Sequence, residues 1–298
     1  MLLPVVAGAL CALCACVVED RNVRPEEAAF RFSSFNVRGI MSEDVGSVFW
    51  TNRVPLIART IVSHGMDVVC VQECRRKMAL ALAAALPDYA CAGPAVKSGK
   101  NHEGNLVFYR KDRFACESEE VFWLSETPDS PFTKLADAQG RRMCVVVRFR
   151  DRRSARPFLV ANTHLDNRSA AARTFGARLI ADRVVKAAKG EGIPLLLAGD
   201  FNARPAEESV QVLRTVLEDA SSVSLSAHEG PQHTFRGWGR DVPHATIDYV
   251  FVTPDVKVLR HATLTDRYDG TFPSDHCPLL ATVAFRPFDH QQTERHKK

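Results

Sequence analysis

The chain of 298 residues has a formal net charge of only +4, and it contains no internal repeat and no low-complexity linker. So small a charge permits an anionic substrate without demanding one. The lack of a linker predicts one domain, over residues 26–286, because a chain of this length can bury a single large core. The polar residues 287–298 are expected to form a solvated tail.

None of the six cysteines in the body of the chain forms a Cys-x-x-Cys pair. A zinc site or a disulfide framework is therefore not favoured, while an isolated disulfide in an oxidising compartment stays open. Cys70 and Cys144 lie in apolar runs, where a thiol usually serves as a small buried hydrophobe.

The first eighteen residues, Met1 to Val18, contain no charge and are rich in Leu, Ala, Val and Cys. They predict a leader that exports the protein to the periplasm, cell envelope or medium, or attaches it to a membrane. The segment lacks the usual preceding positive residues, and spanning a bilayer takes about 20 apolar residues. Leu13-Cys14-Ala15-Cys16 looks like a loose bacterial lipoprotein cleavage box, and an uncleaved signal anchor is the alternative.

From about Ala29, short apolar runs alternate with longer helical patterns, which is typical of an α/β fold. The predicted strands are Phe30–Asn36, Asp67–Gln72, Asn105–Tyr109, Met143–Phe149, Pro157–Thr163, Pro194–Ala198, Ile247–Val252 and Ala281–Phe285. The predicted helices are Arg53–His64, Arg75–Leu86, Ser169–Lys189 and Glu207–Leu217. Periodicity leaves two architectures open, a doubly wound parallel sheet and two stacked sheets covered by helices.

A carboxylate and an amide follow the apolar strand that ends at Ala198. Asp200 and Asn202 are two residues apart, so on an extended chain both can face one pocket. There the carboxylate can accept a proton from water and the amide can donate to a phosphate oxygen. The plainer interpretation is a strand end followed by an Asx turn.

Two carboxylates and a histidine border the last apolar strands. Asp248 begins the run that continues through Phe251, and because an uncompensated buried charge is unfavourable, this carboxylate needs a partner such as a histidine. Asp275 adjoins His276. Adjacent side chains on an extended backbone point opposite ways, so these two are expected to have different partners.

Glu73 and His164 also follow apolar runs. Either residue alone would be typical of a surface position. Together with the other strand ends they predict a single site, because open α/β sheets assemble their sites from residues at such ends.

Six short motifs, in this order, resemble the endonuclease/exonuclease/phosphatase superfamily. They are Ser34–Gly39, Val71–Glu73, Asn162–Asp166, Gly199–Asn202, Ile247–Tyr249 and Ser274–His276. Phe122–Pro128 and Tyr268–Gly270 look like its small bacterial metal-dependent hydrolases. The resemblance extends from Phe32 to about Phe285 and implies a four-layered α/β sandwich, with two mixed sheets packed face to face and helices on the outside.

The resemblance also implies a metal site and a mechanism. Glu73 would ligate the metal, with Asn36 holding it or the phosphate nearby and Asp275 as a second metal-side carboxylate. These oxygen ligands suit Mg²⁺ or Mn²⁺ and not zinc. Water would attack phosphorus in line, and an alkoxide would leave.

The implied catalytic roles fall to five side chains. Asp200, supported by Asn202, would orient or deprotonate the water. Asp248 would pair with His276 while that imidazole contacts the phosphate. His164 would offset charge that develops on the phosphoryl oxygens.

The chain departs in two places from the AP-endonuclease-like members of the superfamily. Arg38 stands where those proteins have an acidic residue, and His164 stands where they have a tyrosine. These departures favour the histidine branch, which holds DNase I-like nucleases, lipid phosphodiesterases and phosphatases.

Three residues outside the motifs are candidates for substrate binding: Asn105, Arg142 and Trp238. The stretch Asn101–Asn105 could line the pocket rim, and Arg141 with Arg142 could bind a second phosphate. Trp238, close to Arg236, suits stacking on a base or resting on a lipid surface. The plainer interpretations are solvated arginines and a packed loop.

Three classes of function remain. The first is a Mg²⁺- or Mn²⁺-dependent hydrolase, nuclease-like or a phosphodiesterase, acting on nucleic acid, phospholipid or a small phosphorylated molecule. The second is a sphingomyelinase-like or other lipid-directed enzyme, and the third is a surface-anchored binding protein that has lost turnover. The presence of all eight expected site residues favours an enzyme, which is expected to be a monomer.

Overall fold

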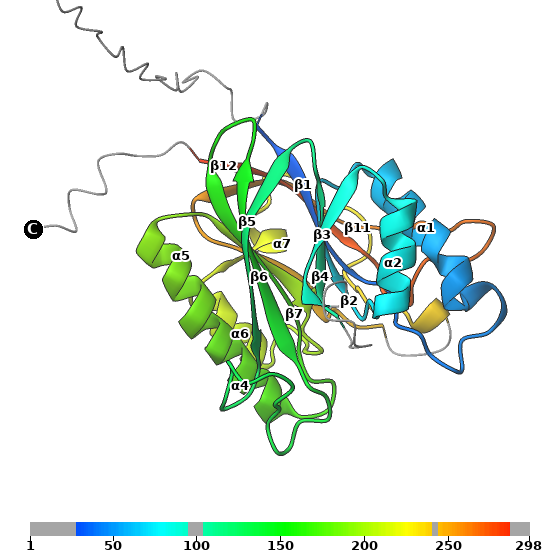
Figure 1. Cartoon of the computed structure of the whole chain (residues 1–298), viewed down its shortest axis with the longest axis horizontal. Helices are drawn as coiled ribbons and strands as arrows, with labels where there is room; N and C mark the ends of the chain where they lie inside the picture. Colours follow the sequence, from blue (N-terminus) through cyan, green and yellow to red (C-terminus); the bar gives the residue numbers. More distant parts are fainter. Residues whose placement is uncertain (1–27, 95–103, 240–243, 287–298) are drawn as a thin grey trace, which may run out of the picture.

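A computed structural model describes residues 28–94, 104–239 and 244–286. Its twelve strands form two six-stranded sheets, which pack face to face with helices on the outside (Figure 1). This is the four-layered sandwich expected from the resemblance, and it excludes the single doubly wound sheet. The predicted leader, the rim stretch 101–103 and the polar tail lie outside the described residues.

The first sheet has the strand order β11-β12-β1-β2-β4-β3. Its strands are β1 (Phe30–Asn36), β2 (Val68–Gln72), β3 (Tyr89–Ala92), β4 (Leu106–Arg110), β11 (Val256–Thr263) and β12 (Leu279–Phe285). Only β1 and β2 pair in parallel. Both therefore end at the same edge, where Asn36 is the last residue of β1 and Glu73 follows β2.

The second sheet has the order β5-β6-β7-β8-β10-β9. Its strands are β5 (Phe114–Trp123), β6 (Met143–Asp151), β7 (Pro157–His164), β8 (Leu195–Asp200), β9 (Glu218–Asp219) and β10 (Asp248–Val252). Here β7 and β8 are the parallel pair. Every residue of β8 is buried, as its continuous apolar sequence predicts for a strand covered on both faces.

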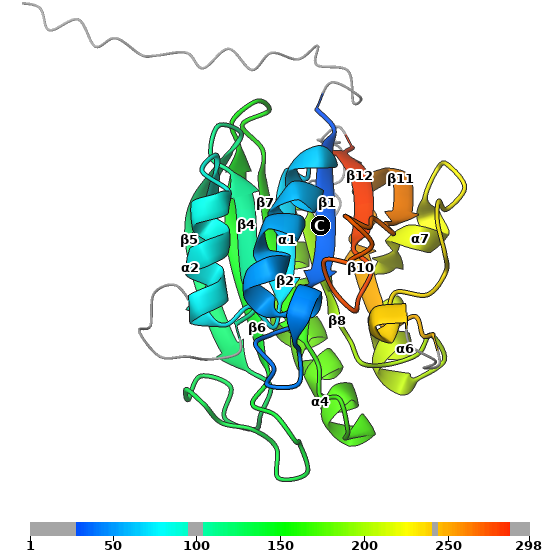
Figure 2. The same ribbon diagram turned by 90° about the vertical axis from the view of Figure 1, so that its right-hand side faces the viewer.

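Two groups of helices cover the sheets, on opposite sides of the pair (Figures 1 and 2). One group is α1 (Trp50–Ser63) and α2 (Arg76–Ala85). The other is α4 (Ala170–Ile180), the π-helical turn η2 (Ala181–Val185), α5 (Lys186–Glu191) and α6 (Glu208–Arg214). The remaining short elements are α7 (Ala220–Val223), η1 (Gly46–Val48) and η3 (Gly237–Gly239).

All eight predicted strands and all four predicted helical regions are present, with boundaries shifted by a few residues. Four strands were not predicted, β3, β5, β9 and β11. The cysteines of the described residues carry free thiols, and Cys70 and Cys144 are buried as predicted. Among the described helices, none combines the length and apolar character needed to cross a membrane.

Candidate active site

Three predicted residues lie side by side at the ends of neighbouring strands. In the register of the second sheet, His164 of β7 pairs with Asp200 of β8, and Asp200 pairs with Asp248 of β10. A Cβ at Gly199 would lie 2.1 Å from the carbonyl oxygen of Thr163. Glycine therefore permits the close approach of β7 and β8 just before the site.

His164, Asp200 and Asn202 are in mutual contact. His164 Nε2 lies 2.9 Å from Asn202 Nδ2 and 3.5 Å from Asp200 Oδ2. The backbone N–H of Asn202 donates to Asp200 Oδ1, and its Nδ2 also donates to the carbonyl of Leu165. The Asx turn and the shared pocket, alternatives from the sequence, therefore occur together. Asn202 adopts the left-handed φ of 47°, a conformation that asparagine tolerates.

Asp248 has the histidine partner that its burial required. Its Oδ2 lies 2.9 Å from His276 Nδ1, and both side chains are buried. His276 Nε2 is 3.8 Å from Asp200 Oδ2. The ring of Phe235 meets the imidazole edge to face at 5.0 Å between centroids, so the imidazole is held from two sides.

Asn36 joins the two sheets at the site. Its Nδ2 donates to Glu73 Oε1 and to Asp200 Oδ2, each at 2.9 Å. Glu73 follows β2 with φ 62°, and its Oε2 accepts the backbone N–H of Gly39 at 2.9 Å. The amide of Asn36 thus bridges a carboxylate from each sheet.

The environment shifts the pKa values of the two carboxyl groups in opposite directions. Burial and the neighbouring charge of Asp248 raise the pKa of Asp200 to about 7. Burial also raises the pKa of Glu73, but His164, the Gly39 N–H and Asn36 together outweigh it and lower the pKa to about 2. Paired groups with divergent pKa values are typical of acid–base sites.

The two histidines are shifted in opposite directions as well. Burial and the charge of Arg142 lower the pKa of His164 well below its ordinary value, although the charge of Glu73 opposes them. Burial lowers the pKa of His276, but the carboxylates of Asp248, Asp200 and Asp275 outweigh it and raise the pKa well above its ordinary value. His276 is therefore an imidazolium at neutral pH.

Asp275 and His276 have different partners, as their adjacency predicted. The Oδ2 of Asp275 accepts from Arg38 Nη1 at 3.2 Å, whereas His276 contacts Asp248. The carboxylate of Asp275 therefore faces a guanidinium group. Its expected role beside a metal stays a prediction.

The donor set at the strand ends fits a divalent ion. Ligand atoms of Glu73, His164 and Asp200 lie within 4.8 Å of one another, as do those of Asp200, Asp248 and His276. Two carboxylates with one imidazole suit Mn²⁺ and also Mg²⁺, which prefers oxygen. Asn36 Oδ1 accepts the backbone N–H of Arg38, so the amide oxygen of Asn36 is already engaged.

The three candidate substrate-binding residues have different surroundings. Asn105 is buried and donates to the carbonyl of Met143. The charge of Arg142 lowers the pKa of His164, and Arg142 Nη2 donates to Asn167 Oδ1 at 3.4 Å. Trp238 lies under the guanidinium of Arg53, which is 5.3 Å from the ring centroid. Their roles toward a substrate stay predictions.

Two supporting contacts were not predicted from the sequence. Gln72 Nε2 donates to Asn162 Oδ1 at 2.8 Å, and Asn162 Nδ2 donates to the carbonyls of Val71 and Leu106. These amides tie the two sheets together near the site. The second set of contacts is made by Arg53, whose fully buried side chain donates to backbone carbonyls of the loop after β1, among them those of Arg38 and Gly39. Its place in an amphipathic helix carried no signal of burial.

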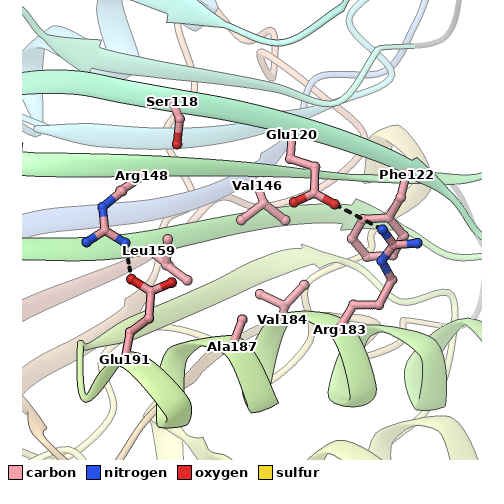
Figure 3. A pocket seen from close by; sticks show the side chains of 10 residues that line it. All are labelled: Ser118, Glu120, Phe122, Val146, Arg148, Leu159, Arg183, Val184, Ala187 and Glu191. Atoms are coloured by element: carbon pink, nitrogen blue, oxygen red, sulfur yellow. Dashed lines mark hydrogen bonds and ion pairs between the residues drawn. The ribbon is translucent and has the colours of Figure 1, made fainter. Parts of the chain in front are cut away.

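A cavity of 340 Å³ lies away from these residues, between β5, β6 and the helical turns η2 and α5 (Figure 3). Its charged side chains are paired, Arg183 with Glu120 and Arg148 with Glu191. None of its lining residues belongs to the strand-end cluster, which is the set of eight site residues predicted from the sequence. The chemistry-bearing groups therefore gather at the strand ends and not in this hollow.

Comparisons with known proteins agree with this geometry. A model of the endonuclease/exonuclease/phosphatase family matches residues 33–276. A mannosyl-6-phosphatase from Bacteroides thetaiotaomicron is 30% identical, with a TM-score of 0.79 over 86% of this chain and 100% of that one. A family member from Bacteroides vulgatus is also 30% identical, with a TM-score of 0.81 over 87% of this chain and 99% of that one.

Among curated proteins, Nocturnin from Drosophila melanogaster is 28% identical, over an alignment that covers 80% of this chain and 42% of that protein. The chain thus spans less than half of that relative, and 61% of mouse Nocturnin. The strand-end cluster, the two-sheet fold and the match over most of the described residues lead to one assignment. The chain belongs to the endonuclease/exonuclease/phosphatase family.

Proposed function

We propose that this protein is a divalent-metal-dependent hydrolase that acts on the phosphate ester of a small phosphorylated molecule. The observation that carries the proposal is the meeting of Glu73, His164 and Asp200, whose ligand atoms lie within 4.8 Å of one another. These residues come from both sheets, and an imidazolium, His276, lies 3.8 Å from the same Asp200 oxygen. Phosphoryl transfer requires this combination of positioning and charge stabilisation.

Asp200 is the candidate base. Because its pKa is raised to about 7 by burial and by Asp248, it exchanges a proton near neutral pH, where general bases work best. Asp200 would take a proton from water as the water oxygen forms its bond to phosphorus, and the ester oxygen would leave with the electron pair of the broken P–O bond. Asn202 fixes the carboxylate through its backbone N–H and holds His164 through its amide.

His276 and His164 would both serve the phosphoryl oxygens. Asp248 holds the imidazolium of His276 by the bond to Nδ1, which leaves Nε2 to face the phosphate. His164, whose pKa is lowered by burial and by the charge of Arg142, would contact the same phosphate. Glu73, with Asn36 beside it, would hold the cation. A bound Mg²⁺ or Mn²⁺ supplies Lewis-acid stabilisation of negative charge on the phosphate.

The similarity to a mannosyl-6-phosphatase over 86% of this chain supports a sugar phosphate as the substrate. The charge of Arg142 acts on the pKa of His164, and Arg142 would bind the anionic substrate beside the reacting phosphate. Asn105 and Trp238 would complete the binding surface. The protein is proposed to act as a monomer.

The proposal is tested by assaying the purified full-length chain on mannose 6-phosphate, bis(p-nitrophenyl) phosphate, single-stranded nucleic acid and sphingomyelin vesicles, each with Mg²⁺, Mn²⁺ or EDTA. We expect the sugar phosphate to be hydrolysed fastest and the chelator to remove activity. Undiminished turnover in EDTA would refute the cation's role. Fastest turnover of sphingomyelin would favour the lipid-directed alternative, and no turnover of any substrate would favour the binding protein.

A nuclease gives a separate signature. Binding to nucleic acid through several phosphates releases counterions, so a nuclease loses activity steeply as salt rises. We expect turnover of a small sugar phosphate to depend only weakly on salt. A steep loss of activity on nucleic acid, together with the highest rate on that substrate, would reassign the protein.

Export or membrane attachment through Met1–Val18 is proposed on the apolar composition of that segment. Fractionation of cells that make the full chain, compared with cells that make a chain lacking residues 2–18, tests it. The full chain is expected in the envelope or medium. Equal amounts of both chains in the cytosol would contradict the proposal.

A further inference from the structure

Thr234 and Phe235 lie between the two segments that carry Asp248 and His276. That pair of side chains joins the two sheets, because Asp248 begins β10 of the second sheet and His276 precedes β12 of the first. Strand pairing within one sheet therefore cannot set how the two side chains meet. Phe235 forms a β-bridge to Ala245 on one side and to His276 on the other, so this short segment fills the gap between them.

The hydroxyl group of Thr234 holds the Asp248 side. The side chain of Thr234 is buried, and its Oγ1 accepts the backbone N–H groups of Ile247 and Asp248, each at 3.0 Å. A hydroxyl oxygen has two acceptor lone pairs, and both are used here. The N–H groups of Thr234 and Phe235 also donate to the carbonyl of Ala245 at 2.9 Å. The backbone at the start of β10 is thereby fixed to one threonine.

Asp248 depends on this backbone for the direction of its carboxylate. Its Oδ2 lies 2.9 Å from His276 Nδ1, whereas its buried Oδ1 has no hydrogen-bond partner among the described residues. Buried polar atoms of side chains usually have such a partner. With one carboxylate oxygen unsupported, the orientation of the group follows the main chain that Thr234 holds.

The carbonyl oxygen of Thr234 holds the His276 side. It accepts the backbone N–H of Cys277, the residue that follows His276, at 2.6 Å. The ring of Phe235, next to Thr234, meets the imidazole of His276 edge to face. Thr234 is therefore bonded through one atom to the Asp248 segment and through another to the His276 segment.

We propose that Thr234 is a positioning residue, which sets how Asp248 and His276 meet and so directs His276 Nε2 at the phosphate. This inference rests on the proposed function, in which that imidazole contacts a phosphoryl oxygen. A displacement of about 1 Å at a reacting group can lower a rate by about 10²-fold. A threonine that fixes the geometry of the pair thus affects turnover through His276, without contact to the substrate.

The test removes the hydroxyl group of Thr234 from the full-length protein and keeps the shape of the side chain. Thr234→Val is expected to lower kcat by about tenfold to hundredfold, a loss typical when the hydrogen-bonded support of a site residue is removed. KM should change little, because the imidazole contact matters most in the transition state. Thr234→Ser keeps the hydroxyl group and should retain most of the turnover.

Thr253→Val is the matched control. Thr253 is also buried, and its Oγ1 accepts the backbone N–H of Leu195 at 2.9 Å. Leu195 begins β8 and Thr253 follows β10, so this hydroxyl group lies at the ends of the same two strands that are far from Asp200 and Asp248. The control makes the same chemical change away from the site and should keep the wild-type kcat.

Proton NMR spectra report on the pair itself. The Nδ1–H proton of His276, which its hydrogen bond to Asp248 protects from exchange, is assigned by its absence from the spectrum of His276→Asn. We expect the same signal in the wild type, in Thr234→Ser and in Thr253→Val, and we expect it to be shifted or lost in Thr234→Val. Thr234→Ala, compared with Thr234→Ser, repeats the test, since these two variants differ only in the hydroxyl group.

The outcomes separate this inference from the proposed function. The role of Thr234 would be overturned, with a hydrolase left in place, by a wild-type kcat in Thr234→Val, by equal losses in Thr253→Val, or by a lower kcat with an unchanged Nδ1–H signal. No turnover of any substrate by the wild type would overturn the proposed function and the positioning role with it. Urea midpoints show that each variant is folded when kcat and the signal are measured.

Discussion

The two sheets build their halves of the site by different means. In the second sheet, His164, Asp200 and Asp248 lie in register on three paired strands, so the strand ladder itself positions their side chains. In the first sheet, Arg38 and Glu73 lie beyond strand ends with φ values of 54° and 62°. Their positions depend on hydrogen bonds from side chains to loop backbone. One half is therefore organised by secondary structure and the other by tertiary contacts.

The largest expected effect comes from changing the chemistry of the part of the site in the second sheet without disturbing its fold. Asp200→Asn keeps the shape of the side chain but removes the proposed base. Turnover should fall by about 10² to 10⁴-fold, the contribution typical of a general base, while the urea midpoint stays close to that of the wild type. Steady-state kinetics and urea denaturation measure the two quantities.

Asp151→Asn is the matched control for that variant. Asp151 is also a buried aspartate at the end of a strand in the same sheet, where it accepts from the N–H of Arg153 and from Ser154 Oγ. It is not one of the strand-end site residues, so its variant should keep wild-type turnover. Equal losses in both variants would mean that Asp200 acts through the fold and not through chemistry.

In the part of the site that belongs to the first sheet, the largest effect is expected from Arg53→Met. This change leaves backbone carbonyls of the loop without their donor, and hydrogen bonds to charged groups contribute about 1.5–3 kcal/mol each. We expect a loss of at least about 3 kcal/mol in the free energy of unfolding. A weaker Mn²⁺ affinity is also expected, because Gly39, which binds Glu73, is released.

Arg113→Met supplies the comparison for Arg53→Met. Arg113 is a second buried arginine that donates to backbone carbonyls, those of Ala28 and Ala29 just before β1. It should lower stability while leaving Mn²⁺ affinity unchanged. If both variants weakened Mn²⁺ binding equally, the result would contradict the claim that the loop contacts of Arg53 support the metal site.

A smaller effect is expected from Asp248→Asn, which removes the charge pair between Asp248 and His276. In the wild type the pKa of His276 lies well above 6.5, chiefly because Asp248 outweighs burial. The stability from this pair is therefore fully present below pH 6.5 and is lost as pH rises through the folded-state pKa. The variant should be destabilised most at low pH, and its imidazole NMR signals should titrate at lower pH.

Two results would contradict that prediction. The first is an unchanged titration of His276 in the variant. The second is a difference in unfolding free energy that grows, and does not shrink, as the pH rises. Either would mean that Asp248 is not the group that keeps His276 charged.

The smallest effect is expected in the cavity of Figure 3, outside both halves. Arg183 pairs there with Glu120, which is largely exposed. It also pairs with the exposed carboxylate of Asp129, which does not line the cavity. Arg183→Ala should lower stability by no more than about 1 kcal/mol and leave turnover unchanged. A loss of turnover of tenfold or more would show that this cavity belongs to the function.

The missed strands show where sequence patterns fail. Both long strands that were not predicted, β5 and β11, carry register shifts, between Cys116 and Ser118 and between Val258 and Arg260. An extra residue interrupts the two-residue alternation on which strand prediction depends. The other two, β3 and β9, have only four and two residues, too few for a periodic signal.

The strand-end residues were predictable because the pattern is local. An apolar run that ends in Asp200 or His164 marks both the strand and its polar end, and the family motifs supplied their order. Arg53 was not predictable, since nothing local separates a buried arginine from an exposed one on an amphipathic helix. Its role depends on loops 5 to 220 residues away in the sequence.

The sequence by itself determined which side chains stand at the strand ends, because strand formation and termination follow from neighbouring residues. Only the tertiary structure decided that Asn36 bridges Glu73 and Asp200, that Arg38 faces Asp275, and which groups are charged. Hydrogen bonds and pKa values depend on distance and burial in space, and these are set by how two separate sheets face each other.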